Sequence, residues 1–117
     1  PWETAKAYCK DGLTEPWHGL VWMNPPYGRD IAPWIKKFIA HGNGVGLTFA
    51  RTDTPWAQDI LQSCSVFFIK GRINFHTPDG VRAKHNGGAP SMLFSIGFFG
   101  RLALARNILP GTYLVRE

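Results

Sequence analysis

"VWMNPPYGRD", residues 21–30, joins a predicted buried strand to a predicted helix. The apolar run Val21–Met23 favours a strand, and it stops at Asn24, Pro25 and Pro26. A proline fixes φ and has no amide donor, so neither proline can continue a strand ladder. Each proline also holds the residue before it in an extended conformation. The predicted strand end is therefore stiff, and it presents the Asn24 side-chain oxygen beside the carbonyl of Pro25.

Two helices and several strands are predicted from the apolar spacing of the chain. The first helix follows Asp30 as a candidate N-cap, has apolar residues at helical spacing in 31–39, and ends at 41–44. A second helix is expected to begin at Thr52 or Asp53, with Pro55 in its first turn, and to run to about Ser63. Expected strands cover residues 20–23, 45–50, 66–69, 92–98 and 112–115, with an extended segment at 73–75 and helical turns at 3–10. Three tryptophans are expected in the core: Trp22, Trp34 and Trp56.

The alternation of strand and helix predicts an α/β fold in a single domain spanning residues 1–117. Crossover connections place strands parallel, and near-continuous apolar strands favour burial on both faces of the sheet. We therefore expect a partial Rossmann-like sheet of mostly parallel strands with flanking helices. Ligands of such sheets bind beyond the carboxyl ends of the strands, which is where Asn24 is predicted to lie.

Composition narrows the class of protein. The chain is 44% hydrophobic and 14% aromatic, as a globular domain is, and no apolar run reaches the roughly 20 residues of a membrane span. Two cysteines, Cys9 and Cys64, predict no disulfide framework and an intracellular protein. The formal charge of +5 favours a polyanionic partner. The four histidines show no ligand-like spacing, so no metal site is expected.

The residues at the predicted strand end suit one kind of ligand. Two acceptors side by side, the Asn24 oxygen and the Pro25 carbonyl, match a planar amino group with two hydrogens to donate. Tyr27 adds a flat face on which a ring can stack. This combination favours a site for an amino group on a flat heterocycle such as adenine.

Four segments of the chain resemble the phage-type DNA N6-adenine methyltransferases. In order they are "KDGLTEPWHGLVWMNPPYG" (10–28), "FARTDTPW" (49–56), "FIKGRINF" (68–75) and "APSMLF" (89–94), and the similarity runs from about residue 3 to residue 98. The NPPY motif alone is shared with rRNA and protein-glutamine methyltransferases. The ordered set of four segments is considerably more specific.

The resemblance implies a methyltransferase sheet, S-adenosylmethionine as cofactor and double-stranded DNA as substrate. It also implies a phage or prophage origin and a location in the cytoplasm of a bacterial host. Asn24 and the Pro25 carbonyl would accept hydrogen bonds from the adenine amino group, with Pro26 completing the turn. Tyr27 would stack on a base flipped out of the duplex. The segment Asp11, Gly12 and Leu13 resembles the one that meets the cofactor's adenine.

The residues expected to contact DNA are Arg51, Arg72, Arg82 and Lys84. Several of the residues named so far also have a structural interpretation. A solvent-exposed acid in a loop, or a helix cap, explains Asp11 as well as the cofactor role does. Arg51 and Asp53 could instead cap the second helix or form a salt bridge. Arg72 could equally be an exposed charge at a sheet edge. The basic loop at 76–90, with Arg82 and Lys84, suits phosphate contact or a solvated hairpin.

Related enzymes of the resembled family place a cofactor-binding strand before the segment that matches "ETAKAYCKDGL". We therefore expect a chain truncated at its N-terminus, with self-association or a partner chain supplying the missing segment. Two other functions stay open: methylation of rRNA or of a protein glutamine, and an inactive module that binds only nucleic acid or a partner.

Overall fold

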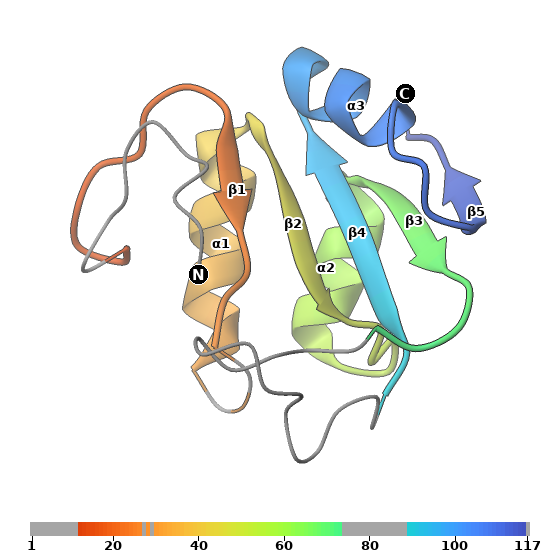
Figure 1. The fold of residues 1–117 in the computed structure, drawn as a ribbon. Helices are drawn as coiled ribbons and strands as arrows, with labels where there is room; N and C mark the ends of the chain where they lie inside the picture. Colours follow the sequence, from red (N-terminus) through yellow and green to blue (C-terminus); the bar gives the residue numbers. More distant parts are fainter. Residues whose placement is uncertain (1–11, 27, 29, 74–88, 117) are drawn as a thin grey trace, which may run out of the picture.

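A computed structural model describes residues 12–26, 28, 30–73 and 89–116 of the chain, and it has three helices and five strands in these ranges (Figure 1). The strands are β1 (Val21–Met23), β2 (Gly44–Phe49), β3 (Ser65–Ile69), β4 (Ser91–Ile96) and β5 (Gly111–Leu114). The helices are α1 (Ile31–His41), α2 (Pro55–Ser63) and α3 (Phe98–Ala105). The expected helical turns at residues 3–10 lie outside the described residues.

The five strands form one mixed sheet in the order β1-β2-β4-β3-β5. β1 pairs with β2 in parallel, whereas the pairings of β2 with β4, of β4 with β3 and of β3 with β5 are antiparallel. The expectation of mostly parallel strands is therefore wrong, although β1, β2 and β3 do run in one direction. β4 enters between β2 and β3 from the opposite end, and no pattern in the sequence specifies that insertion.

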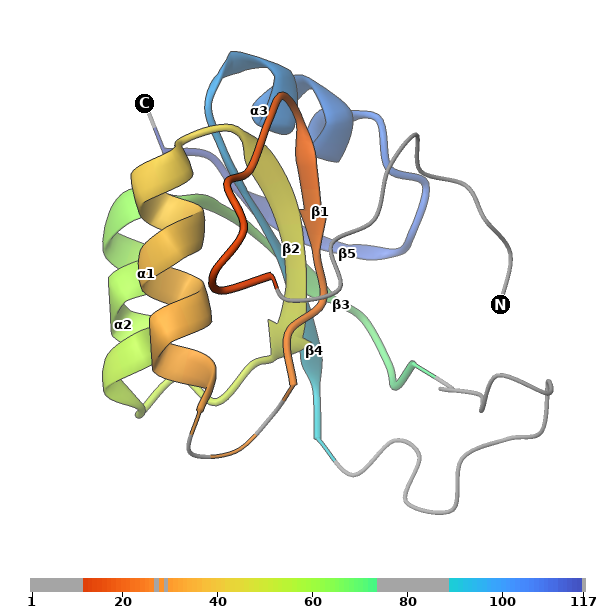
Figure 2. The same cartoon turned by 90° about the vertical axis from the view of Figure 1, so that its left-hand side faces the viewer.

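Two helices cover one face of the sheet, which Figure 2 shows edge-on. Ile31, Ile35 and Phe38 of α1 are buried at helical spacing, and Ala57 and Ile60 of α2 join them. From the sheet, the core on this face includes Met23, Val66, Met92 and Phe94. The Phe38 and Phe94 rings meet edge to face, with centroids 5.0 Å apart. The described helices include none long and apolar enough to cross a membrane.

β4 is the most deeply buried strand. Met92 and Phe94 face the α1–α2 side, and Leu93 lies in a second cluster with Leu47 and Phe67 on the other side. Phe94 lies opposite Gly46 of β2, and its ring occupies the space that a side chain at position 46 would need. Burial on both faces, as expected from near-continuous apolar strands, is thus confirmed for β4.

Helix boundaries follow the predicted positions with one correction. Asp30 takes the N-cap position of α1 but makes no side-chain cap hydrogen bond. Gly42 ends α1 in the left-handed region, where glycine has no steric penalty, and its amide donates to the Phe38 carbonyl at 3.1 Å. The N-cap of α2 is Thr54, whose hydroxyl accepts from the Ala57 amide at 3.3 Å. Neither Thr52 nor Asp53 caps α2, because Pro55 opens the helix and leaves the cap to its immediate predecessor.

The C-terminal part differs most from expectation. The predicted strand at 92–98 ends at Ile96, because Gly97 adopts φ +82° and turns the chain into α3. No helix was predicted over Phe98–Ala105. α3 packs on the sheet face opposite α1, with Gly100 so close to the Gly44 carbonyl that a side chain there would overlap it. The extended segment predicted at 73–75 is not a strand at Ile73, and residues 74 and 75 lie outside the described residues.

Cys64 gives a prediction about pH. The thiol is buried, and this burial raises its pKa from 9.0 to about 12, against a smaller opposing effect of the Arg116 charge. Between pH 9 and 12 the unfolded chain has lost this proton and the folded chain keeps it. The free energy of unfolding should therefore fall with pH in this window, by about 1.4 kcal/mol per pH unit from this group. Urea unfolding of wild type and Cys64→Ala between pH 7 and 11 measures the difference in slope, and equal slopes would contradict the prediction.

Candidate functional site

The turn at Asn24–Pro26 lies at the predicted place in the chain. It directly follows β1; Asn24 and Pro26 are exposed, and Pro25 is buried. Gly28 then turns the chain at φ +111°, and its carbonyl accepts from the Ile31 amide at 3.4 Å as α1 begins. The buried proline fixes the backbone at the point where Asn24 reaches solvent. Tyr27 lies outside the described residues.

Two arginines lie at the same edge of the sheet. β1, β2 and β3 run in one direction, so their carboxyl ends share one edge, which is at the bottom of Figure 1. Arg51 follows β2 and Arg72 follows β3, and both are exposed. Arg51 lies over the Phe49 ring at 5.6 Å and caps no helix. The structure therefore places Asn24, Arg51 and Arg72 at one edge, whereas Arg82 and Lys84 lie outside the described residues.

The Gly12–Leu13 turn lies against α1. Gly12 is buried beneath the ring of Trp34, which leaves no room for a side chain at position 12. The Trp17 indole nitrogen donates to the Gly12 carbonyl at 2.7 Å. Leu13 is 38% exposed, which leaves its side chain open to contact. Asp11 lies outside the described residues.

Lys37 is the main anchor of this turn, and sequence reasoning missed it. Its ammonium donates to the carbonyls of Gly12 at 2.8 Å, Leu13 at 3.1 Å and Glu15, and it lies over the Trp17 ring at 5.0 Å. One turn further along α1, the His41 ring binds the Gly19 carbonyl at 2.7 Å. In the helical pattern Lys36 and Lys37 fall on the face opposite the apolar residues, and no local signal shows that residues 12–15 fold back onto Lys37.

One helix thus holds both candidate segments. The Asn24–Gly28 turn leads into the first residue of α1, and the middle of α1 holds residues 12–15 through Trp34 and Lys37. For a cofactor, the described part of this turn offers the exposed Leu13 side chain. The carbonyl of Gly12 is already taken up by Trp17 and Lys37. The described residues include no group of three or more His, Cys, Asp or Glu side chains placed to hold a metal ion.

Comparison with known families gives the class of the protein. Residues 5–113 match the family model described as DNA N-6-adenine-methyltransferase (Dam). The chain belongs to the Dam family. This agrees with the four segments on which the resemblance rests, and it favours DNA over rRNA or a protein glutamine as the substrate class. No curated protein and no solved structure matches the Dam-family chain.

Lys37 gives a prediction about the turn. Lys37→Met keeps the length of the side chain and removes the ammonium that three carbonyls share. We expect the free energy of unfolding to fall by about 1–3 kcal/mol, since hydrogen bonds to a charged donor are among the stronger ones. Amide hydrogen exchange should become faster in residues 12–19. Urea unfolding and exchange followed by mass spectrometry measure the two effects.

Lys36→Met is the matched control. It removes the same charge from the adjacent, exposed position of α1. A surface change of this kind is expected within about 0.5 kcal/mol of wild type. Equal effects of the two substitutions would show that charge, and not the hydrogen bonds of Lys37, is responsible.

Proposed function

We propose that this Dam-family chain transfers a methyl group from S-adenosylmethionine to the N6 amino group of an adenine in double-stranded DNA. The observation that carries the proposal is the end of β1. There an exposed Asn24 stands next to a buried Pro25, at the sheet edge that also bears Arg51 and Arg72. Family membership supports DNA adenine as the class of substrate.

The proposed chemistry at the amino group uses two acceptors. The Asn24 side-chain oxygen and the Pro25 carbonyl accept one hydrogen each from the adenine N6 group. These hydrogen bonds fix the amino group and concentrate electron density on its nitrogen, which has to attack the methyl carbon. The buried Pro25 keeps the acceptors in place before the substrate arrives, so little reorganisation is needed during the reaction.

The target base has to leave the duplex to reach these acceptors. Unstacking a base costs a few kcal/mol, and a stacking surface in the site offsets part of this cost. We assign that role to Tyr27, whose ring follows Pro26 in the chain. Stacking on an aromatic side chain is worth about 1–3 kcal/mol per base.

The cofactor segment of the proposal is Asp11, Gly12 and Leu13. The exposed Leu13 side chain fits contact with an adenine ring, and the Lys37 and Trp17 hydrogen bonds hold the turn that carries it. When bound, the cofactor supplies the methyl group as an electrophile. The residues of this chain orient it relative to Asn24.

Contact with the DNA backbone is assigned to the basic residues. Arg51 and Arg72 are exposed at the edge that bears Asn24, and we assign Arg82 and Lys84 to the same task. Such contacts give affinity and orientation but carry no sequence information. The net charge of +5 supports this assignment.

One experiment tests the reaction and its substrate class. The full chain, including any segment that precedes residue 1 in the natural protein, is incubated with methyl-labelled S-adenosylmethionine together with one of three substrates: duplex DNA, RNA or a protein mixture. We expect label in DNA alone, recovered as N6-methyladenine. A second candidate function is DNA binding without methyl transfer. It is favoured because the Gly12 carbonyl, in the proposed cofactor segment, already accepts hydrogen bonds from Trp17 and Lys37. Binding of DNA with neither methyl transfer nor cofactor binding would favour that candidate and overturn the first.

Asn24 gives the central prediction. Asn24→Ala removes one acceptor, and we expect methyl transfer to slow roughly 100-fold or more, as loss of one positioned polar group does in other enzymes. DNA affinity should change little, because phosphate contacts dominate it. Single-turnover rates and a DNA-binding titration separate the two quantities.

The control for Asn24 is Gln62→Ala, which removes an exposed amide from the end of α2. Its rate should equal that of wild type. If Asn24→Ala retained the wild-type turnover, Asn24 would not have the proposed role in methyl transfer.

Tyr27 gives a prediction that separates ring from hydroxyl. Tyr27→Phe keeps the stacking surface and should be nearly silent, whereas Tyr27→Ala should lower both the rate and the amount of flipped-base complex. A 2-aminopurine at the target position reports flipping by its fluorescence. If Phe were as damaging as Ala, the hydroxyl and not the ring would be the functional group.

A further inference from the structure

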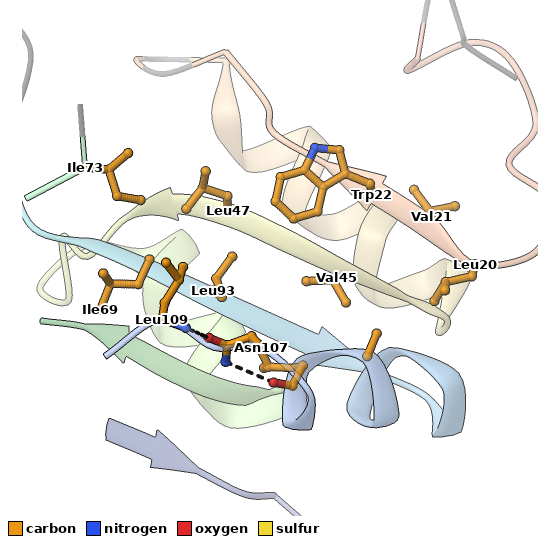
Figure 3. Close-up of a pocket in the computed structure, with 12 residues that line it drawn as sticks. Leu20, Val21, Trp22, Val45, Leu47, Ile69, Ile73, Leu93, Asn107 and Leu109 are labelled. Carbon is orange, nitrogen blue, oxygen red and sulfur yellow. Dashed lines mark hydrogen bonds between the residues drawn. The ribbon is translucent and has the colours of Figure 1, made fainter. Parts of the chain in front are cut away.

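The apolar groove on the sheet face opposite α1 is poorly suited to the polar edges of DNA bases. It has a volume of about 460 Å³, and no charged side chain is among the residues that line it (Figure 3). Its one side-chain amide, Asn107, donates to the Leu104 carbonyl at 3.0 Å and accepts from the Leu109 amide at 2.8 Å. Side chains that can read a DNA sequence lie elsewhere, at the sheet edge that bears Asn24.

The turn at residues 51–54 lies further out at this edge than Asn24 does. It connects β2 to the lower end of α2 in Figure 1. β1 pairs with β2 only as far as Gly46, while β2 runs on to Phe49. Ala50 still pairs with the chain that leads into β4, through an amide–carbonyl hydrogen bond of 2.7 Å. At about 3.3 Å per residue, the turn therefore begins roughly 10 Å beyond Asn24.

This difference in height matters for a base that is flipped out of the duplex. The flipped base enters the site at Asn24, while the base pairs on either side of it stay in the duplex. The turn at residues 51–54 stands further out, so it is the part of this edge that is placed to meet those flanking base pairs.

Three hydrogen bonds brace the turn. The Arg51 carbonyl accepts from the Thr54 amide at 3.1 Å and from the Thr54 hydroxyl at 2.7 Å. The Gln58 side chain of α2 donates to the Thr52 carbonyl at 2.6 Å. Thr52 and Asp53 form the two corners of the turn, and both are exposed. Because the backbone is fixed before any ligand binds, little order has to be lost when a corner side chain makes a contact.

Asp53 has neither of the structural roles that the sequence left open for it. The cap of α2 is Thr54. Among the described residues the Asp53 carboxylate makes no hydrogen bond and no ion pair. Arg51, two positions away, lies over the Phe49 ring instead. An exposed, unpaired carboxylate therefore lies at an edge to which contact with DNA is assigned.

A carboxylate at such an edge suits one base in particular. Phosphate repels it, and in the major groove guanine and thymine present acceptors, which repel it as well. Adenine presents its amino donor beside the N7 acceptor. Cytosine presents its amino group without an acceptor in the major groove, so it is the base that a carboxylate recognises best.

We propose that Asp53 is a specificity-determining residue, which accepts a hydrogen bond from the amino group of a cytosine in a base pair that flanks the target adenine. The adjacent Arg51 keeps its assigned contact with the DNA backbone, which positions the turn without reading sequence. This inference rests on the proposed function for the identity of the target base. It adds a source of sequence preference to that function.

Selection from a library of DNA duplexes tests the proposal. The full chain, including any segment that precedes residue 1 in the natural protein, is mixed with duplexes in which random base pairs flank one adenine. Bound duplexes are sequenced, and in a second arm the duplexes methylated with S-adenosylmethionine are sequenced. Wild type should enrich cytosine at one flanking position.

Two substitutions of Asp53 have different expected results. Asp53→Ala should lower the enrichment of cytosine at that position at least about tenfold and leave the other positions unchanged. Asp53→Asn should replace the preference for cytosine by one for adenine, because an amide pairs with both the amino group and N7 of adenine. Circular dichroism of each variant confirms that it is folded.

Asp59→Ala is the matched control, since it removes the same charge from an exposed position of α2. Its sequence profile should equal that of wild type. An acid before α2 also interacts favourably with the helix dipole, but that interaction does not depend on the base sequence of the DNA. A wild-type profile without a preference for cytosine would overturn the proposal. So would an Asp53→Ala profile equal to that of wild type, or a loss of preference that Asp59→Ala shares.

The two arms separate this inference from the proposed function. A preference for cytosine in the bound duplexes that depends on Asp53, without any methylation, would overturn methyl transfer and support the role of Asp53. Methylation with a profile that does not depend on Asp53 would support methyl transfer and overturn the role of Asp53.

Discussion

The contact between Phe94 and Gly46 is the constraint on which the sheet depends. β4 pairs with β2 along six residues, and the Phe94 ring fills the space above Gly46 while meeting Phe38 of α1 edge to face. A side chain at position 46 would displace the ring from this place. Because β4 also pairs with β3, this packing fixes the spacing of β2 and β3. It therefore also positions the loops that follow the carboxyl ends of these two strands.

The candidate site is a consequence of that arrangement together with α1. Three strands of common direction bring Asn24, Arg51 and Arg72 to one edge, and α1 begins where the Asn24 turn ends. The same helix holds residues 12–15 by means of Lys37 and Trp34. Two segments to which separate tasks are assigned, acceptance of an amino group and contact with a cofactor, are therefore fixed to one rigid element. Their relative position depends on α1 and not on the loop between them.

Local features of the sequence predicted most of the elements. The helices at 31–41 and 55–63 and the five predicted strands are confirmed to within about two residues. Periodicity, Gly42 and Pro55 are signals that lie in the local sequence, which is why these elements could be predicted. Long-range facts were missed. The insertion of β4 between β2 and β3 cannot be read from strand–helix alternation, and α3 was missed because its apolar run continues that of β4 through Gly97. Trp22 was expected in the core and is 58% exposed, because β1 is an edge strand. For the site, the stiff turn at Asn24–Pro26 was predictable from its prolines, whereas Lys37 acts on residues more than twenty positions earlier in the chain.

The position of β4 also determines the order in which the sheet can form. β2 and β3 emerge during synthesis before β4, yet they do not pair with each other in the finished sheet. Until residues 91–96 arrive, each has an unpaired edge toward the gap that β4 will fill, and such edges invite wrong partners. Pairings of this kind join residues far apart in sequence, which slows folding because loop-closure entropy is lost before the contacts form. The sheet is thus completed from its middle, by a strand that is made after both of its neighbours.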